Sequence, residues 1–145
     1  MEAILNQTAV MIAISCAGLF FMIGLLTGAW KFFCMMKSET FTAPHYVDIA
    51  HRAALLYSFA AIVIAVFAYF SAFSDKINTI ATVAPLLFFA ISIVNYIKLG
   101  IENKTNNQLR ASENRVVDKV IMSTLMVAEI GGFSILLIGF FIRIL

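Results

Sequence analysis

Four long apolar runs alternate with short polar connections along this chain. They cover about residues 8–33, 53–73, 78–99 and 120–142, and a helix needs roughly 20 apolar residues to cross a bilayer core. The runs are continuous, whereas strands of a membrane β-barrel alternate apolar and polar positions in blocks of about ten. Backbone groups in lipid must then pair within helices. The pattern predicts an all-α integral membrane bundle of four transmembrane helices, with residues 1–145 as one domain.

The composition agrees with a membrane protein. The chain is 62% hydrophobic and 12% charged, and its mean hydropathy is +0.97. Soluble domains are about half apolar and a quarter charged. Residues 1–7 contain no Lys or Arg, so we expect the first run to be retained in the mature protein and not to be cleaved as a signal peptide.

Basic residues are distributed unevenly over the two sides of the predicted bundle. Eight flank the first and third connections and two lie on the other side, which predicts cytoplasmic loops at 34–50 and 100–118 and both termini outside the inner (plasma) membrane. The net charge of +2 then reflects topology, and no nucleic-acid partner is expected. The eight are Lys31, Lys37, Arg52, Lys98, Lys104, Arg110, Arg115 and Lys119, and the two are Lys76 and Arg143.

The first run contains a pair of glycines at the spacing of closely packed membrane helices. Gly24 and Gly28 are four residues apart, which lets two helix backbones approach closely where lipid supplies no hydrophobic driving force. We favour packing against a neighbouring helix of the same chain over a dimer contact. Cys16 and Cys34 have no spacing typical of a disulfide framework or a zinc site.

Glu129 lies near the middle of the last apolar run. An ionisable residue at membrane depth is a candidate functional group, because burying a charge there costs about 2.5–3.5 kcal/mol on insertion scales. The functional interpretations are a proton relay, a substrate contact or a partner for a cation. The alternative is a neutral carboxyl that donates a packing hydrogen bond to the backbone or to Ser123, Thr124 or Ser134.

A helix start precedes the second run. Thr42 is a candidate cap, Pro44 suits a first helical turn, and Asp48 precedes Arg52 by four residues, a favourable ion-pair spacing. His51 is then helical and close to the cytoplasmic interface.

His51 is the candidate metal ligand of the chain. It shares a helix face with Leu55 and Ser58, followed by Ile62, Ala65 and Tyr69, and such a face suits a flat apolar cofactor. Asp48 lies about one turn earlier, where it can accept the second ring proton, as is common for a ligating histidine. The alternative is a structural histidine that is bonded to a backbone carbonyl or a lipid headgroup.

Other chemistries have weaker support in the sequence. Residues 34–36 (Cys-Met-Met) together with His45 offer soft ligands for copper, but methionine is ordinary in membrane helices. No glycine-rich phosphate loop or serine triad motif is present. ATP-driven and hydrolytic chemistry are therefore not expected.

Three segments resemble the styrene oxide isomerase and hydroxylaminobenzene mutase group of small four-span membrane proteins. They are residues 49–55 (Ile-Ala-His-Arg-Ala-Ala-Leu), the turn 73–76 (Phe-Ser-Asp-Lys) and residues 94–96 (Val-Asn-Tyr). His51, the Asp-Lys turn and Tyr96 fall in register with that group without a gap, over about a third of the chain.

The resemblance implies a cofactor and an activity. In the styrene oxide isomerases, haem b is held between the subunits of a trimer, and its iron is bound by the histidine that matches His51. The ferric iron acts as a Lewis acid on an epoxide oxygen, and the tyrosine matching Tyr96 belongs to the active site. We therefore expect a haem-binding homo-oligomer, an isomerase acting on a small apolar substrate dissolved in membrane lipid, with Glu129 as a possible acid or base.

Two positions depart from the family pattern. Tyr57 stands where the family has asparagine, and Phe88 stands where it has aspartate. Loss of these polar groups bears on epoxide isomerisation, whereas haem binding through His51 does not need them. The alternative function is a non-catalytic haem-binding or assembly subunit of a larger membrane complex.

Overall fold

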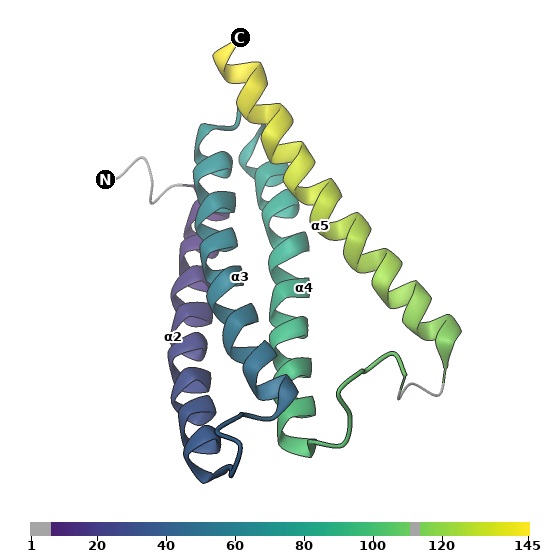
Figure 1. The fold of residues 1–145 in the computed structure, drawn as a ribbon. Helices are drawn as coiled ribbons and strands as arrows, with labels where there is room; N and C mark the ends of the chain where they lie inside the picture. Colours follow the sequence, from purple (N-terminus) through teal and green to yellow (C-terminus); the bar gives the residue numbers. More distant parts are fainter. Residues whose placement is uncertain (1–6, 111–113) are drawn as a thin grey trace.

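The computed structural model describes residues 7–110 and 114–145, and this part of the chain forms four α-helices. They are α2 (Thr8–Lys37), α3 (His45–Phe70), α4 (Asp75–Glu102) and α5 (Arg115–Ile144) (Figure 1). Each helix is long and apolar enough to cross a membrane. The predicted all-α four-helix membrane bundle is confirmed.

The helices run up and down beside one another. The start of α2 and the end of α5 lie toward one end of the molecule, and the α2–α3 and α4–α5 connections lie at the other (Figure 1). Helices α2, α3 and α4 pack together along their length, whereas α5 meets them near its C-terminal end and leans away from α4 toward its N-terminal end (Figure 1). The α5 residues that are buried are Gly132, Leu136 and Gly139.

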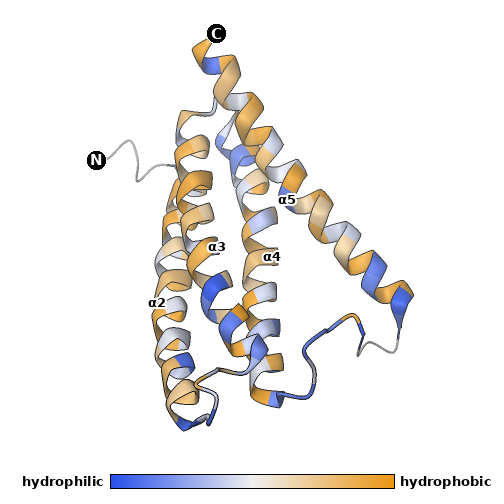
Figure 2. Ribbon diagram, in the orientation of Figure 1, coloured by the Kyte–Doolittle hydropathy of each residue, from blue (hydrophilic) through white to orange (hydrophobic). Residues whose placement is uncertain are grey.

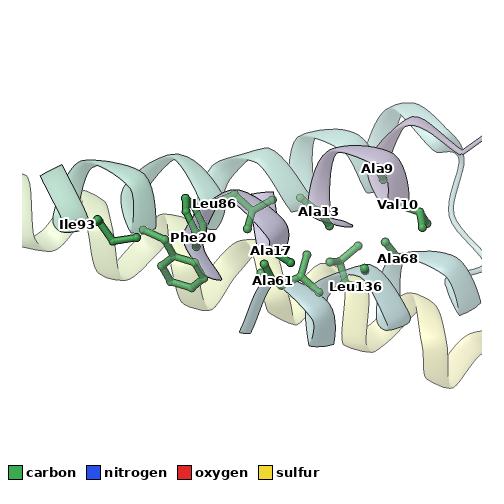
Figure 3. Packing of buried hydrophobic residues seen from close by; sticks show 14 of the residues in the cluster. Ala9, Val10, Ala13, Ala17, Phe20, Ala61, Ala68, Leu86, Ile93 and Leu136 are labelled. Atoms are coloured by element: carbon green, nitrogen blue, oxygen red, sulfur yellow. The ribbon is translucent and has the colours of Figure 1, made fainter. Parts of the chain in front are cut away.

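Small side chains allow α2 and α3 to approach closely. Buried alanines of both helices meet larger side chains of α4 and α5, including Leu86, Ile93 and Leu136 (Figure 3). Lipid is as apolar as such a core, so close packing holds the helices together. Many large apolar side chains are exposed on all four helices, whose ribbons are mostly coloured as hydrophobic in Figure 2. A bilayer solvates such a surface.

The boundaries of α3 differ from the expected ones. The helix begins at His45, with Pro44 at the N-cap position, and Thr42 bonds to Thr40 (2.7 Å between their Oγ1 atoms) instead of capping. It ends at Phe70, three residues before the end of the apolar run. The prediction that Thr42 caps this helix is therefore wrong, because the N-cap residue is Pro44 and no side chain caps the helix.

The other three helices extend beyond the apolar runs into polar residues. α2 continues to Lys37, α4 begins at Asp75 and continues to Glu102, and α5 begins at Arg115. Asn103 ends α4 in the left-handed conformation (φ 45°), which asparagine tolerates better than most residues. The apolar runs therefore underestimate the lengths of these helices.

Candidate functional site

His51 fits into a slot that the glycine pair of α2 provides. Its Nδ1 donates a hydrogen bond to the carbonyl oxygen of Gly24 at 2.8 Å. A Cβ atom on Gly28 would lie 2.8 Å from the ring Cε1 and 3.0 Å from Nδ1. The predicted packing of the glycine pair against a helix of the same chain is confirmed. The alternative interpretation of His51, a structural histidine bonded to a backbone carbonyl, predicted this hydrogen-bond partner correctly.

Asp48 does not orient the imidazole. Its carboxylate forms ion pairs with Lys31 Nζ at 2.6 Å and with Arg52 Nη2 at 2.8 Å. The predicted pairing of Asp48 with Arg52 is confirmed, and Lys31 additionally connects α2 to α3. The prediction that Asp48 accepts the second ring proton of His51 is wrong. The Gly24 carbonyl accepts that proton, and the Asp48 carboxylate pairs with Lys31 and Arg52 instead.

The part of the expected cofactor face of α3 that lies nearest His51 is covered by α2, whereas Ile62 farther along the same face is exposed. Leu55 packs against Gly24, since a Cβ atom there would lie 2.6 Å from Leu55 Cδ2. Ser58 is buried, and its hydroxyl donates to the carbonyl of Leu55 at 2.6 Å. Within one chain, these two side chains are occupied by helix packing.

The second ring nitrogen of His51 is available as a ligand. Nε2 has no hydrogen-bond partner among residues 7–110 and 114–145, and the residue is only half-buried. In that part of the chain, no three His, Cys, Asp or Glu side chains lie close enough to hold a metal ion. A single histidine therefore suits a group that brings most of its own metal ligands, such as a porphyrin, better than a bare ion.

Tyr96 lies against the first turn of α3. Its ring stacks on that of Tyr46, with centroids 6.2 Å apart and planes 18° apart. The Tyr46 hydroxyl in turn accepts a hydrogen bond from the backbone N–H of Gln108 at 2.7 Å. This contact connects the end of α4 and the following connection to the start of α3.

Tyr57 stacks on Phe89 of α4, with centroids 4.3 Å apart and planes 6° apart. Its hydroxyl lies near Ser92. Tyr57 stands where the styrene oxide isomerase group has asparagine, so this position has an aromatic ring with one polar group, the hydroxyl. Phe88, at the family's aspartate position, is half-buried and brings no polar group.

Glu129 of α5 lies within electrostatic range of two tyrosines on the neighbouring helices. It interacts electrostatically with the hydroxyls of Tyr57 and Tyr96. Its Oε1 atom is buried and has no hydrogen-bond partner in the described part of the chain. No hydrogen bond joins Glu129 to Ser123, Thr124 or Ser134 in the described part of the chain, and the Thr124 hydroxyl donates to the carbonyl of Val120 at 2.8 Å. Tyr96 and Glu129, the two residues predicted to be catalytic, thus lie within electrostatic range of each other.

His51 lies on a different side of α3 from this polar cluster of Tyr57, Tyr96 and Glu129. Tyr57 follows His51 by six residues, which is about 240° around a helix. His51 contacts α2, whereas Tyr57 contacts Phe89 of α4. One chain therefore does not present His51 and the polar cluster to the same small ligand.

A second polar group lies near the other end of α4, and it was missed from the sequence. Asn78 Oδ1, Thr79 Oγ1 and Thr82 Oγ1 are buried without a hydrogen-bond partner among the described residues. Asn78 uses its amide nitrogen to donate to the carbonyl of Phe73 at 3.0 Å, which stabilises the α3–α4 turn. The available signal was the spacing of Asn78 and Thr82, four residues apart in an apolar run.

Comparison with protein-family models finds no match, and comparisons with curated proteins and with solved structures find none either. The resemblance to the styrene oxide isomerase group rests on the residues quoted for it and stays a prediction.

Proposed function

We propose that this chain is a haem-b-binding protein of the plasma membrane, in which Nε2 of His51 would bind the iron. The observation that supports this proposal is the hydrogen bond from Nδ1 to the Gly24 carbonyl. Because Nδ1 carries the proton, the lone pair of neutral imidazole is on Nε2. A ligating histidine is commonly oriented in this way by a backbone carbonyl. Gly28 leaves the space that the ring needs.

The haem is proposed to lie between chains of a homo-oligomer, which the family resemblance makes a trimer. His51 and Tyr96 lie on different sides of α3, so a ligand between them needs a second copy of the chain. Phe59 and Ile62 are exposed and lie within about 80° of His51 around α3. These side chains offer an apolar surface for a porphyrin or a neighbouring subunit.

For the polar cluster we propose a role in a redox-neutral isomerisation of a small apolar epoxide that enters from the bilayer. Bound ferric haem supplies a Lewis acid for the epoxide oxygen. The hydroxyls of Tyr96 and Tyr57 orient the substrate oxygen by donating hydrogen bonds, and the Glu129 carboxyl gives or takes a proton. The stacked rings of Tyr57 and Phe89 exclude water.

A non-catalytic haem-binding or assembly subunit is the second candidate. It is favoured by the close stack of Tyr57 on Phe89 and by Phe88, which together place aromatic rings where the resembling family has polar side chains. Incubating haem-loaded protein with a panel of small epoxides separates the two candidates. Rearranged product supports the isomerase, and no product supports the subunit.

We further propose the orientation in which both termini are outside and the α2–α3 and α4–α5 connections are cytoplasmic. The excess of Lys and Arg around these two connections supports it.

The experiment for haem binding is an absorption spectrum of protein purified after haem-supplemented expression. We expect a Soret band in the wild type and its loss in His51→Ala. His45→Ala is the matched control, because His45 is exposed and its ring lies against Tyr46; it should keep the band. A wild type without the band, or a His51→Ala variant that keeps it, would contradict the proposal.

A further inference from the structure

The inward face of α5 separates from the bundle toward its N-terminal end. This face is buried at Gly132, Leu136 and Gly139 and only half-buried at Met122 and Leu125. Figure 1 shows the same change as an increasing distance between α5 and α4 toward the α4–α5 connection. Met122 and Leu125 are therefore partly accessible on this face of α5.

A hollow lies at the wide end of this separation. Its volume is about 510 Å³, within the range of small-molecule pockets. It is lined by residues of the α4–α5 connection and of the first two turns of α5, with Leu109 and Met122 as its apolar part. Its lining thus continues into the apolar inward face of α5.

The polar lining of the hollow is mainly cationic. Arg110, Arg115 and Lys119 are exposed and face it, with Asp118 as the carboxylate among them. None of the three cations lies within ion-pair distance of a carboxylate in residues 7–110 or 114–145. Three cations beside the apolar side chains of Leu109 and Met122 suit a ligand that has an anionic group and an apolar chain.

We infer that this hollow binds the headgroup phosphate of an anionic phospholipid, one acyl chain of which lies along Met122 and Leu125 between α5 and α4. Basic pockets between transmembrane helices at the cytoplasmic surface bind anionic headgroups, since the phosphate charge is complementary and the chains stay in the bilayer. A zwitterionic lipid carries its own ammonium group next to the phosphate and gains less from the three cations. The inference does not depend on the haem.

The test uses the full-length protein reconstituted in phosphatidylcholine bilayers. Electron paramagnetic resonance of spin-labelled phosphatidylglycerol and spin-labelled phosphatidylcholine gives the fraction of each lipid that the protein immobilises. We expect the wild type to prefer the anionic lipid about threefold or more. The variant Arg110→Gln/Arg115→Gln/Lys119→Gln should lower this preference to about one. The single variant Arg110→Gln should lower it in part, which provides a test if the triple variant does not fold.

The matched control is Lys37→Gln/Lys98→Gln/Lys104→Gln, which removes the same charge from exposed residues of the same end of the bundle. It should keep the wild-type preference. An equal fall in both triple variants would show general surface attraction and overturn the site. So would equal immobilisation of the two lipids by the wild type, as expected if a second copy of the chain fills the space. Loss of the preference on addition of millimolar inorganic phosphate would assign the hollow to a free anion.

Discussion

Gly132 of α5 lies directly against Pro85 of α4. A Cβ atom on Gly132 would lie 2.8 Å from Pro85 Cδ and 2.6 Å from the carbonyl oxygen of Ala81. Proline has no N–H, so this carbonyl lacks its usual donor four residues later in the helix. A Cα–H group of a glycine on a neighbouring helix can make a weak hydrogen bond to such an oxygen. This contact fixes the point at which α5 joins the bundle, about one turn beyond Glu129.

Gly132→Ala should therefore destabilise the protein by about 1–3 kcal/mol, because neither a backbone carbonyl nor a proline ring can move aside as a flexible side chain does. Unfolding in mixed micelles with increasing denaturing detergent measures the change. Gly131→Ala is the control, since nothing lies within 4 Å of the added Cβ. It should leave stability unchanged or raise it by up to about 1 kcal/mol. Equal losses in the two variants would contradict the contact.

Thr82→Val should leave stability unchanged or raise it by about 1 kcal/mol. The Thr82 hydroxyl is buried without a partner in the described part of the chain, and valine removes it with little change of shape. Thr27→Val is the control, because the Thr27 hydroxyl bonds to the carbonyl of Ile23 at 2.8 Å, and it should cost about 0.5–1.5 kcal/mol. The same unfolding assay applies. A larger loss for Thr82→Val than for Thr27→Val would show that the Thr82 hydroxyl has a partner, such as a bound water.

Tyr96→Phe and Glu129→Gln should each lower epoxide turnover by about 10²-fold if the polar cluster performs the proposed proton transfer and orientation. Haem content, read from the Soret band, should not change, because the proposed iron ligand is His51 and neither variant removes an iron ligand. Tyr69→Phe is the control, since Tyr69 contacts Phe70 near the other end of α3. Full turnover in Glu129→Gln would instead assign that carboxyl to packing.

Cysteine labelling should place the α4–α5 connection in the cytoplasm. In a background with Cys16→Ala and Cys34→Ala, a cysteine at Asn106 should react with a membrane-impermeant reagent only after the cells are permeabilised. A cysteine at Asp75, which is exposed at the start of α4, should react in intact cells. The reverse pattern would invert the proposed orientation.

The number and class of helices follow from the sequence because lipid leaves the backbone few alternatives. The ends of the helices do not follow, because polar residues such as Lys37 and Glu102 continue a helix beyond the lipid-soluble part. Conversely, α3 stops at Phe70 although the apolar run continues. Ser71 instead takes part in the turn to α4, where its Oγ accepts from the N–H of Phe73 at 3.2 Å.

The candidate residues were found by type and depth, whereas their partners depend on how the helices are rotated. Spacing along α3 made Asp48 the nearest acceptor for His51, but the acceptor is a carbonyl of α2, which no pattern within α3 reveals. In the same way, Glu129 was singled out as a buried carboxyl, but its proximity to Tyr57 and Tyr96 depends on where α5 crosses the bundle. The apolar periodicity of a single helix does not predict which residues of another helix it contacts.

The most direct test of His51 as the proposed iron ligand is the Soret band of His51→Gly, measured before and after addition of free imidazole. The substitution removes the ring next to Gly28 and leaves a space of its size beside α2. We predict that the variant lacks the band of the wild type and that imidazole, by replacing the missing ligand, restores it when haem is supplied. A variant that keeps the wild-type band without imidazole would contradict the account.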